Sequence, residues 1–216
     1  MAQFVALSDT HGYNDRLTIP DGDILLHAGD LTQGGSPAEV VAAYDWLNRL
    51  PHRHIIVTPG NHDFAFTEPQ FRSLLAERFP RVQTLIDQSC TVDGFVIYGS
   101  PWQPWFLDWA FNFYRGARGE RQAISTWARI PDDTAILLTH TPPYGILDAI
   151  ASGHHEGCQF LRERVEQIAS LRVHVFGHIH ESHDRDLRLR HLSINAAICD
   201  HRYRPVFPAQ VFAIRK

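Results

Sequence analysis

Short apolar runs alternate with amphipathic stretches along most of the chain. Five runs have the length and composition of buried strands, at 4–7, 24–28, 55–57, 135–138 and 173–176. Ser36-Pro-Ala-Glu39 has the pattern of a helix capping box with proline in the first turn, which predicts a helix to about Leu50. Thr67-Glu-Pro-Gln70 repeats this pattern before a helix that ends near Phe79. Further helices are expected at two places, near 120–128 and 158–170.

Turn signals and the C-terminal segment complete the pattern. Asp93-Gly94 lies between two strand-like runs and is a hairpin signal, and the segment from Leu187 onward has mostly the composition of strands. Alternating strands and helices predict an α/β protein with buried central sheets. The hairpin and the C-terminal strands predict a second sheet that faces the first.

Composition narrows the class of protein. A length of 216 residues without a Gly/Ser-rich linker suits a single domain over 1–216. The formal net charge of −4 disfavours a long basic groove for polymeric nucleic acid. The three cysteines form no CxxC pair, and no apolar run reaches the roughly 18 residues that a membrane span needs. We therefore expect a cytoplasmic protein without a membrane partner. Histidine is the unusual count, at 14.

Polar side chains with metal-binding or acid–base chemistry follow each of the five predicted strands. They are Asp9-Thr-His11, Gly29-Asp30, Gly60-Asn-His-Asp63, Thr139-His140 and Gly177-His-Ile-His180. Ligands of α/β proteins collect beyond the carboxyl ends of strands. Each motif alone is common by chance, but their occurrence in order at successive strand ends predicts one shared site.

This ordered set resembles the calcineurin-like metallophosphoesterase family, whose pattern is Asp-x-His, Gly-Asp, Gly-Asn-His-(Asp/Glu), His and Gly-His-x-His. Other stretches are similar to its metallophosphoesterase-domain-containing subfamily, at 27–32, 99–104, 109–112, 139–143 and 194–197. Some members of that subfamily have glycine for a metal-binding histidine of the last motif and are weakened as enzymes, whereas this chain keeps His178. The resemblance implies a four-layer α-β-β-α sandwich of two mixed sheets flanked by helices.

The resemblance also implies a ligand set for two divalent metal ions. The first metal would be bound by Asp9, His11, Asp30 and His180, and the second by Asp30, Asn61, His140 and His178. Asp30 would bridge the two ions. Oxygen and imidazole donors without thiolate suit Mn, Fe, Zn, Co or Ni better than Ca. We expect one of these transition metals, with Mn favoured.

The family's remaining motif residues carry catalytic expectations. By resemblance, His62 lies outside the ligand set, stabilises charge on the phosphoryl group and protonates the leaving oxygen. Asp63 either orients His62 or holds the loop, and the sequence leaves both open. Thr10, Thr139 and His27 are expected to have structural roles around the ligands.

Two segments are candidates for substrate contacts. Residues 102–114 are unusually aromatic; most of these rings are expected to pack on the core, and Trp102 is the best single candidate for stacking on a nucleobase. Arg115 is expected to be a solvated surface residue. His154 or His155 precedes a predicted helix and would lie near an anionic substrate.

The leading hypothesis is a dinuclear metal-dependent phosphodiesterase that hydrolyses small phosphodiesters by attack of metal-activated hydroxide. The subfamily resemblance implies 2′,3′- or 3′,5′-cyclic nucleotides as substrates. One alternative keeps the chemistry and changes the substrate, to a phosphomonoester or a nucleotide pyrophosphate. Another is a non-catalytic nucleotide-binding or scaffold protein on the same fold. The aromatic segment would also suit a homodimer contact.

Overall fold

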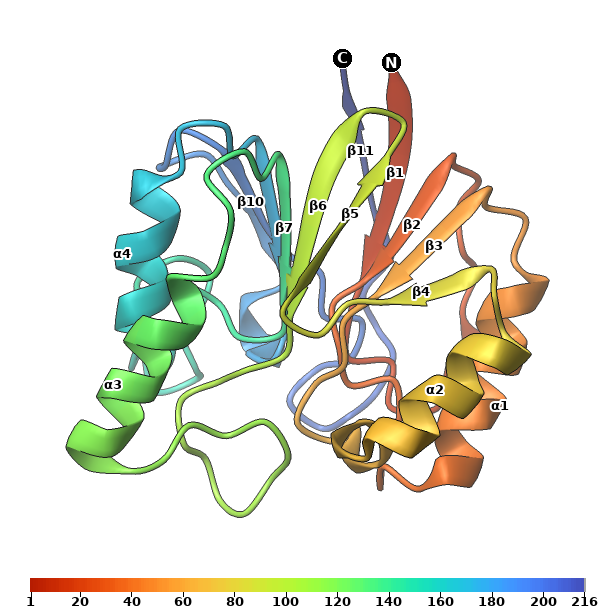
Figure 1. Cartoon of the computed structure of the whole chain (residues 1–216), viewed down its shortest axis with the longest axis horizontal. Helices are drawn as coiled ribbons and strands as arrows, with labels where there is room; N and C mark the ends of the chain where they lie inside the picture. The colour runs from red at the N-terminus through yellow and green to blue at the C-terminus, as the bar shows by residue number, and fades with distance from the viewer. Residues whose placement is uncertain (216) are drawn as a thin grey trace.

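Two mixed β-sheets lie face to face in the computed structural model, which describes residues 1–215 (Figure 1). The first sheet has the strand order β11-β1-β2-β3-β4. Its strands are β1 (Ala2–Leu7), β2 (Ile24–His27), β3 (His54–Val57), β4 (Val82–Thr84) and β11 (Gln210–Ile214). Strands β1 to β4 are parallel, so their carboxyl ends share one edge, and β11 pairs antiparallel with β1.

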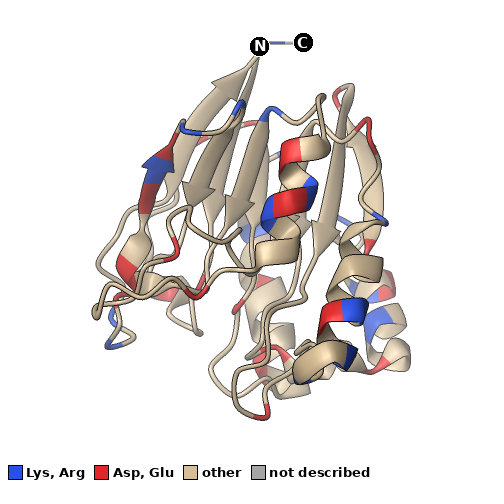
Figure 2. Ribbon diagram, turned by 90° about the vertical axis from the view of Figure 1, so that its left-hand side faces the viewer, with Lys and Arg blue, Asp and Glu red and all other residues tan. Residues whose placement is uncertain are grey.

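The second sheet has the strand order β5-β6-β7-β8-β10-β9. Its strands are β5 (Gln88–Val92), β6 (Phe95–Ser100), β7 (Ile136–Thr139), β8 (Val173–Phe176), β9 (Asp184–Asp186) and β10 (Leu192–Asn195). The four strands β6, β7, β8 and β10 are parallel, whereas β5 and β9 pair antiparallel. The edge strand β9 carries charges of both signs (Figure 2), which discourages pairing with another sheet.

Helices cover the outer face of each sheet (Figure 1). The first sheet is covered by α1 (Pro37–Arg49) and α2 (Pro69–Arg78), and the second by α3 (Gly116–Trp127) and α4 (Gln159–Gln167). Charged residues lie mainly on helices and loops, and the central strands are almost free of them (Figure 2). The expected α-β-β-α sandwich is confirmed.

A hydrophobic cluster lies between the two sheets. Phe4 and Leu26 from the first sheet meet Ile97, Leu138 and Val175 from the second, and all five are fully buried. Each such side chain stabilises the fold by about 1.5–3 kcal/mol relative to an exposed position. Two further clusters fill the spaces between each sheet and its helices. The sheets are therefore a rigid base for the loops at their ends.

Of the two capping boxes and the hairpin predicted from the sequence, one capping box and the hairpin are confirmed. The capping box is confirmed, because Ser36 and Glu39 exchange side-chain and backbone hydrogen bonds at the start of α1. The hairpin is confirmed too, with positive φ at both Asp93 (51°) and Gly94 (85°). The second capping box is wrong. Thr67 ends a short 3₁₀ turn, where its hydroxyl donates to the carbonyl of Phe64 at 2.8 Å, and the turn delays the start of α2 to Pro69.

The prediction of strands for most of the C-terminal segment is wrong. In the described part of this segment, only β10 and β11 form as strands of the main sheets, and residues 196–209 are a loop. The carboxylate of Asp200 holds this loop by accepting hydrogen bonds from the backbone N–H of Arg202 and Arg204 and from the Arg204 guanidinium. Proline at 205 and 208 supplies no N–H for a ladder.

Within residues 1–215, none of the helices combines the length and apolar character needed to cross a membrane. All three cysteines are unpaired; Cys158 and Cys199 are buried and Cys90 is partly buried.

Candidate metal centre

The loops that follow β1, β2, β3, β7 and β8 meet at one end of the sandwich, at the bottom of Figure 1. Backbone hydrogen bonds join the two sheets here. The N–H of Ser8, after β1, donates to the carbonyl of Ala196, after β10, and the N–H of Ile198 donates to the carbonyl of Ser8, both at 2.9 Å. Motif residues from both sheets are therefore held in one place.

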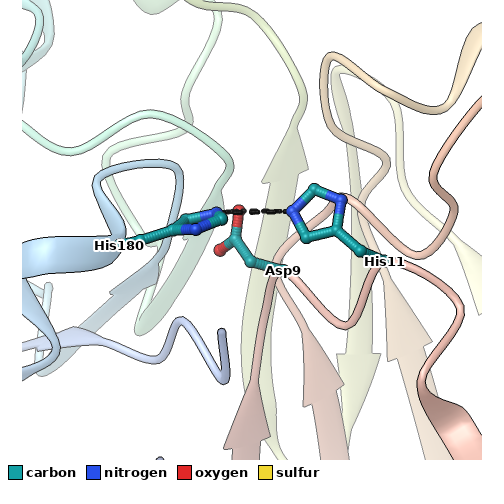
Figure 3. Close-up of side chains that lie close together, drawn as sticks. All are labelled: Asp9, His11 and His180. Atoms are coloured by element: carbon teal, nitrogen blue, oxygen red, sulfur yellow. Dashed lines mark hydrogen bonds and ion pairs between the residues drawn. The ribbon is translucent and has the colours of Figure 1, made fainter. Parts of the chain in front are cut away.

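Asp9, His11 and His180 form the first group of facing donor atoms, with the carboxylate between the two rings (Figure 3). Nε2 of His180 lies 3.2 Å from Oδ1 of Asp9 and 3.3 Å from Nε2 of His11. All three residues are buried. Residues separated by about 170 positions in the sequence thus present three donor atoms to one point.

Asp30 lies in the middle of the remaining motif residues. Its Oδ2 is 3.8 Å from Nε2 of His11, 3.9 Å from Nε2 of His62 and 3.5 Å from Nε2 of His140. Nε2 of His140 is also 2.8 Å from Oδ1 of Asn61. One carboxylate oxygen therefore faces donor atoms on both sides, the arrangement expected of a residue that bridges two ions.

His178 completes the set from the second sheet. Its ring packs edge-on against the ring of His140, with centroids 4.9 Å apart, and it lines the pocket in front of the cluster. The structure thus brings all seven expected ligands together, at the ends of strands from both sheets.

Four of the motif imidazoles share one hydrogen-bond arrangement. In each, Nδ1 faces a backbone carbonyl: His11 with Thr32 (3.3 Å), His62 with Gln33 (2.7 Å), His140 with Ala28 (3.0 Å) and His180 with Asp200 (2.9 Å). A carbonyl oxygen only accepts, so each Nδ1 carries the hydrogen and each Nε2 turns its lone pair toward the centre. This arrangement is typical of histidines that bind a metal through Nε2.

The resulting donor set fits a bound cation. The Nε2 lone pairs of His11 and His180 face each other at 3.3 Å beside a carboxylate, and the lone pair of His140 faces an amide oxygen at 2.8 Å. Such contacts between acceptors are unfavourable unless a positive charge or a proton lies between them. Carboxylate, amide and imidazole donors together suit divalent transition metals.

The pKa values of two ligand imidazoles show that the carboxylates of the centre attract positive charge, whereas burial lowers the pKa of His11 to about 4 and that of His178 to about 3. Burial raises the pKa of Asp9, but the hydrogen bond from His180 and the charges of His180 and His140 together outweigh burial and hold this pKa below its usual range. Burial also opposes protonation of His140 and His180, yet the neighbouring Asp30 and Asp9 carboxylates raise the pKa of each to about 9. A metal at Nε2 would take the place of these protons, so metal binding will weaken as the pH falls.

Close backbone packing explains the glycines of the motifs. A Cβ on Gly29 would lie 2.5 Å from Nδ1 of His140, and Cβ atoms on Gly60 and Gly177 would overlap the carboxylates of Asp30 and Asp9. These contacts are closer than van der Waals packing permits, so only glycine lets the ligand loops approach one another.

Four of the motif residues adopt a left-handed backbone conformation that is uncommon outside glycine. They are Asp9, His11, Asp30 and His178, with φ of 55°, 42°, 53° and 67°. Such backbone strain is concentrated at functional sites in proteins.

The structure separates the roles of His62 and Asp63. The Gln33 carbonyl orients His62, whose Nε2 faces Asp30. The buried Asp63 carboxylate accepts hydrogen bonds from the N–H groups of Leu31, Thr32 and Gly60 and from the Thr32 hydroxyl. Asp63 makes no hydrogen bond to the imidazole of His62. Of its two expected roles, these hydrogen bonds fit the loop-holding one.

Asp63 carries its negative charge in an unfavourable place. Burial and the nearby Asp30 charge raise the pKa of Asp63 to about 6, despite the hydrogen bonds that favour its charged form.

The structural roles expected of Thr10, His27 and Thr139 agree with the structure. Thr10 contacts His27 at 3.1 Å, and the Thr139 hydroxyl donates to the carbonyl of Thr141 at 2.7 Å.

The expected substrate residues lie elsewhere. The ring of Trp102 stacks on Phe113, and its indole N–H donates to Asp87 at 2.8 Å, away from the pocket. His155 contacts the Asp148 carboxylate at 2.6 Å, and neither His155 nor the exposed His154 lines the pocket. Arg115 is exposed, as expected, and lies over the ring of Trp105.

Sequence reasoning missed the rings that do line the pocket. The pocket measures about 610 Å³ and is bordered by Trp105, Phe106 and Trp109 from the aromatic segment and by Tyr203 from the C-terminal loop. Trp109 belongs to residues 102–114, whose aromatic composition already marks them as a candidate for substrate contacts. Tyr203 has no such signal, because its place depends on a left-handed turn (φ 58°) in a segment predicted as strand.

Comparison with known proteins identifies the family. The model of the calcineurin-like phosphoesterase family matches residues 2–182. The chain belongs to this family. Among its relatives, the chain is 39% identical to human metallophosphoesterase domain-containing protein 1, over 95% of this chain and 69% of that protein.

Two further proteins resemble this calcineurin-like phosphoesterase at lower sequence identity. A Synechococcus protein named as a probable cyclic nucleotide phosphodiesterase is 28% identical over 74% of this chain and 58% of its own length. The crystal structure of TT1561 from Thermus thermophilus superposes with a TM-score of 0.62 at 15% identity, over 90% of this chain and 88% of that one. The latter likeness supports the fold.

As a calcineurin-like phosphoesterase, the chain belongs to a family that uses divalent metals. Its candidate ligand groups include Asp9, His11 and His180, and also Asp9, Asp30 and His140. The phosphoester hydrolase class follows from the family, and the donor atoms that such chemistry needs lie together at the strand ends.

Proposed function

We propose that this protein is a dinuclear metal-dependent phosphodiesterase that hydrolyses small phosphodiesters, cyclic nucleotides among them. The observation that carries the proposal is the convergence of six ligand side chains around Asp30, with imidazole Nε2 atoms turned inward by backbone carbonyls. The name of the Synechococcus relative supports the cyclic nucleotide class.

The ligand side chains divide into two sets around Asp30. Asp9, His11 and His180 would hold one divalent ion, and Asn61, His140 and His178 the other. Two such ions supply the activation of the attacking water and neutralise charge on the phosphoryl oxygens. Mn is our preferred metal, because the donors are oxygen and imidazole atoms.

His62 has the position of a general acid. Its Nδ1 donates to the Gln33 carbonyl, so protonation at Nε2 gives an imidazolium whose free N–H points toward the centre. Its Nε2 lies 3.9 Å from the Asp30 carboxylate, so it faces the proposed reaction centre. That proton would pass to the leaving oxygen when the ester bond breaks, which prevents the loss of a strongly basic alkoxide.

The test is an ester panel on purified protein whose metal has been removed and then replaced with Mn. We expect hydrolysis of 2′,3′- or 3′,5′-cyclic AMP and of bis(p-nitrophenyl) phosphate, at least about tenfold faster than of AMP or a nucleotide pyrophosphate. Chelator should abolish turnover. Faster hydrolysis of the monoester would identify a phosphomonoesterase. Fewer than one bound metal per chain, without turnover, would favour the scaffold alternative.

A further inference from the structure

Three aromatic rings pack against histidine rings of the centre. The ring of Trp109 lies over the ring of His62, with centroids 4.1 Å apart and planes tilted by 32°. The ring of Phe106 meets the ring of His178 edge-on at 6.4 Å. These two residues come from the loop between β6 and α3, which lies below the sheets in Figure 1.

The third ring comes from the C-terminal loop. Tyr203 packs edge-on against His11 at 4.7 Å and against His180 at 5.2 Å between centroids. We call Phe106, Trp109 and Tyr203 the aromatic collar. All three line the pocket, so a substrate that reaches the centre passes between apolar ring faces. Phe106 is 54% exposed and Tyr203 38%, which leaves their surfaces available to a ligand.

The charges around the pocket are unsuited to a second anionic group. The sequence has 19 arginines, yet none of them lines the pocket within the described residues 1–215. Arg204 beside Tyr203 is bound by the Asp200 carboxylate. Apart from Asp30 and the four histidines, the ionisable acidic or basic side chains that line the pocket are Glu156 and Glu181. A second phosphate would therefore meet carboxylates, without an arginine of the pocket lining to neutralise it.

The pocket is large enough for a substituent with a flat ring. Its volume of about 610 Å³ is within the usual range for drug-sized ligands. Stacking between a ligand ring and an aromatic side chain is tolerant of the ring's chemistry, so the collar can accept different flat rings.

We propose that the aromatic collar selects phosphodiesters that carry a single negative charge and a flat, uncharged ring as one substituent, and that Glu156 and Glu181 exclude substrates with a second anionic group. This inference rests on the proposed function and narrows its substrate class. Phe106 is the specificity-determining residue, because it is the most exposed ring of the collar and lies beside His178.

A matched pair of esters tests the collar. Phenyl p-nitrophenyl phosphate and methyl p-nitrophenyl phosphate have the same charge and leaving group and differ only in the retained substituent. The Mn-loaded wild type should prefer the phenyl ester, and Phe106→Ala should lower the phenyl-to-methyl ratio of kcat/KM by about 5- to 10-fold. Tyr114→Ala is the matched control, because Tyr114 is an equally exposed ring (52%) of the same region outside the pocket lining.

A second pair tests the acidic rim. 4-Carboxyphenyl p-nitrophenyl phosphate adds one anionic group to the same ring. The wild type should disfavour it against the phenyl ester, and the double variant Glu156→Gln/Glu181→Gln should reduce this discrimination by about fivefold at low salt and less at high salt.

The outcomes separate the two proposals. If the wild type hydrolyses none of the esters, the proposed function fails. If it hydrolyses the phenyl and methyl esters and the ratio is the same in Phe106→Ala and in the wild type, the collar has no role in selection and the further inference fails. Equal use of the carboxyphenyl and phenyl esters by the wild type would overturn the exclusion of a second charge.

Discussion

At the scale of single residues, His62 differs from the other histidines of the centre by its stacking partner. Trp109 covers one face of the ring, and the Gln33 carbonyl fixes its Nδ1. Both contacts hold Nε2 toward the Asp30 carboxylate, where the proposed function places the phosphoryl group, and His62 stays outside the two proposed ligand sets.

We predict that His62→Ala retains both metals and loses turnover. Because the leaving oxygen loses its proton donor, kcat for a cyclic nucleotide should fall by about 10²–10⁴-fold. The p-nitrophenyl esters offer an internal control, since p-nitrophenolate leaves without protonation and their loss should be much smaller. Metal content is measured on the same sample. Equal losses for both ester classes would remove the acid role from His62.

Residue identity at the centre can be predicted from the sequence, whereas residue contacts around it cannot. Asp9, Asp30 and His140 follow strands, and strand ends fix where their side chains lie. The rings of the aromatic segment have no such constraint, because left-handed turns at Leu107 (φ 50°) and Phe111 (φ 56°) decide which ring faces the pocket. Leucine and phenylalanine do not favour a left-handed conformation, so their occurrence does not predict these turns. The sequence therefore does not distinguish Trp109 from Trp102.

At the scale of elements, glycine allows the ligand loops to pack closely against one another. A Cβ on Gly60 would overlap Oδ1 of Asp30 and lie 2.7 Å from Cε1 of His140. The loop after β3 thus sets the distance between the loops after β2 and β7.

We predict that Gly60→Ala displaces Asp30 and lowers Mn affinity by about 10- to 100-fold, measured by calorimetric titration. Gly34→Ala is the matched control, since its Cβ would meet only the Glu39 carboxylate, at 3.3 Å, on a side chain that can move. An unchanged Mn affinity in Gly60→Ala would show that the loops adapt to the added methyl group.

Elements themselves are predictable where burial determines them. The five strands with continuous apolar runs all form, and α1 begins at its capping box. Strand composition is misleading in the segment 196–209, because its apolar residues belong to a loop held by the ion pair of Asp200 and Arg204, which composition does not reveal.

At the scale of the whole molecule, the centre joins two sheets that also meet through apolar packing, backbone hydrogen bonds and side-chain contacts such as that of Arg185 with Gln210. Asp9, Asp30 and Asn61 extend from the first sheet, and His140 and His178 from the second. Ions bound between them would cross-link the sandwich.

Mn should therefore raise the melting temperature. At a free concentration 100 times Kd, binding stabilises the folded state by about 2.7 kcal/mol, which corresponds to about 5–10 °C for a chain of this size. Calorimetry with Mn and then with chelator measures the shift and its reversal. Asp30→Asn should lose most of the shift, and Asp15→Asn, on the surface, should keep it. An equal shift in all three proteins would place the bound ions elsewhere.

The left-handed backbone at Asp9, His11, Asp30 and His178 has a consequence for engineering. Each such residue costs about 1–3 kcal/mol relative to a relaxed conformation, and glycine would relieve much of that cost. Directed evolution of the metal-free protein for heat resistance alone would therefore tend to replace these four residues first. A library screened in this way would become more heat-stable while losing its reactive centre, so thermostabilisation of this enzyme should include selection for turnover at every round.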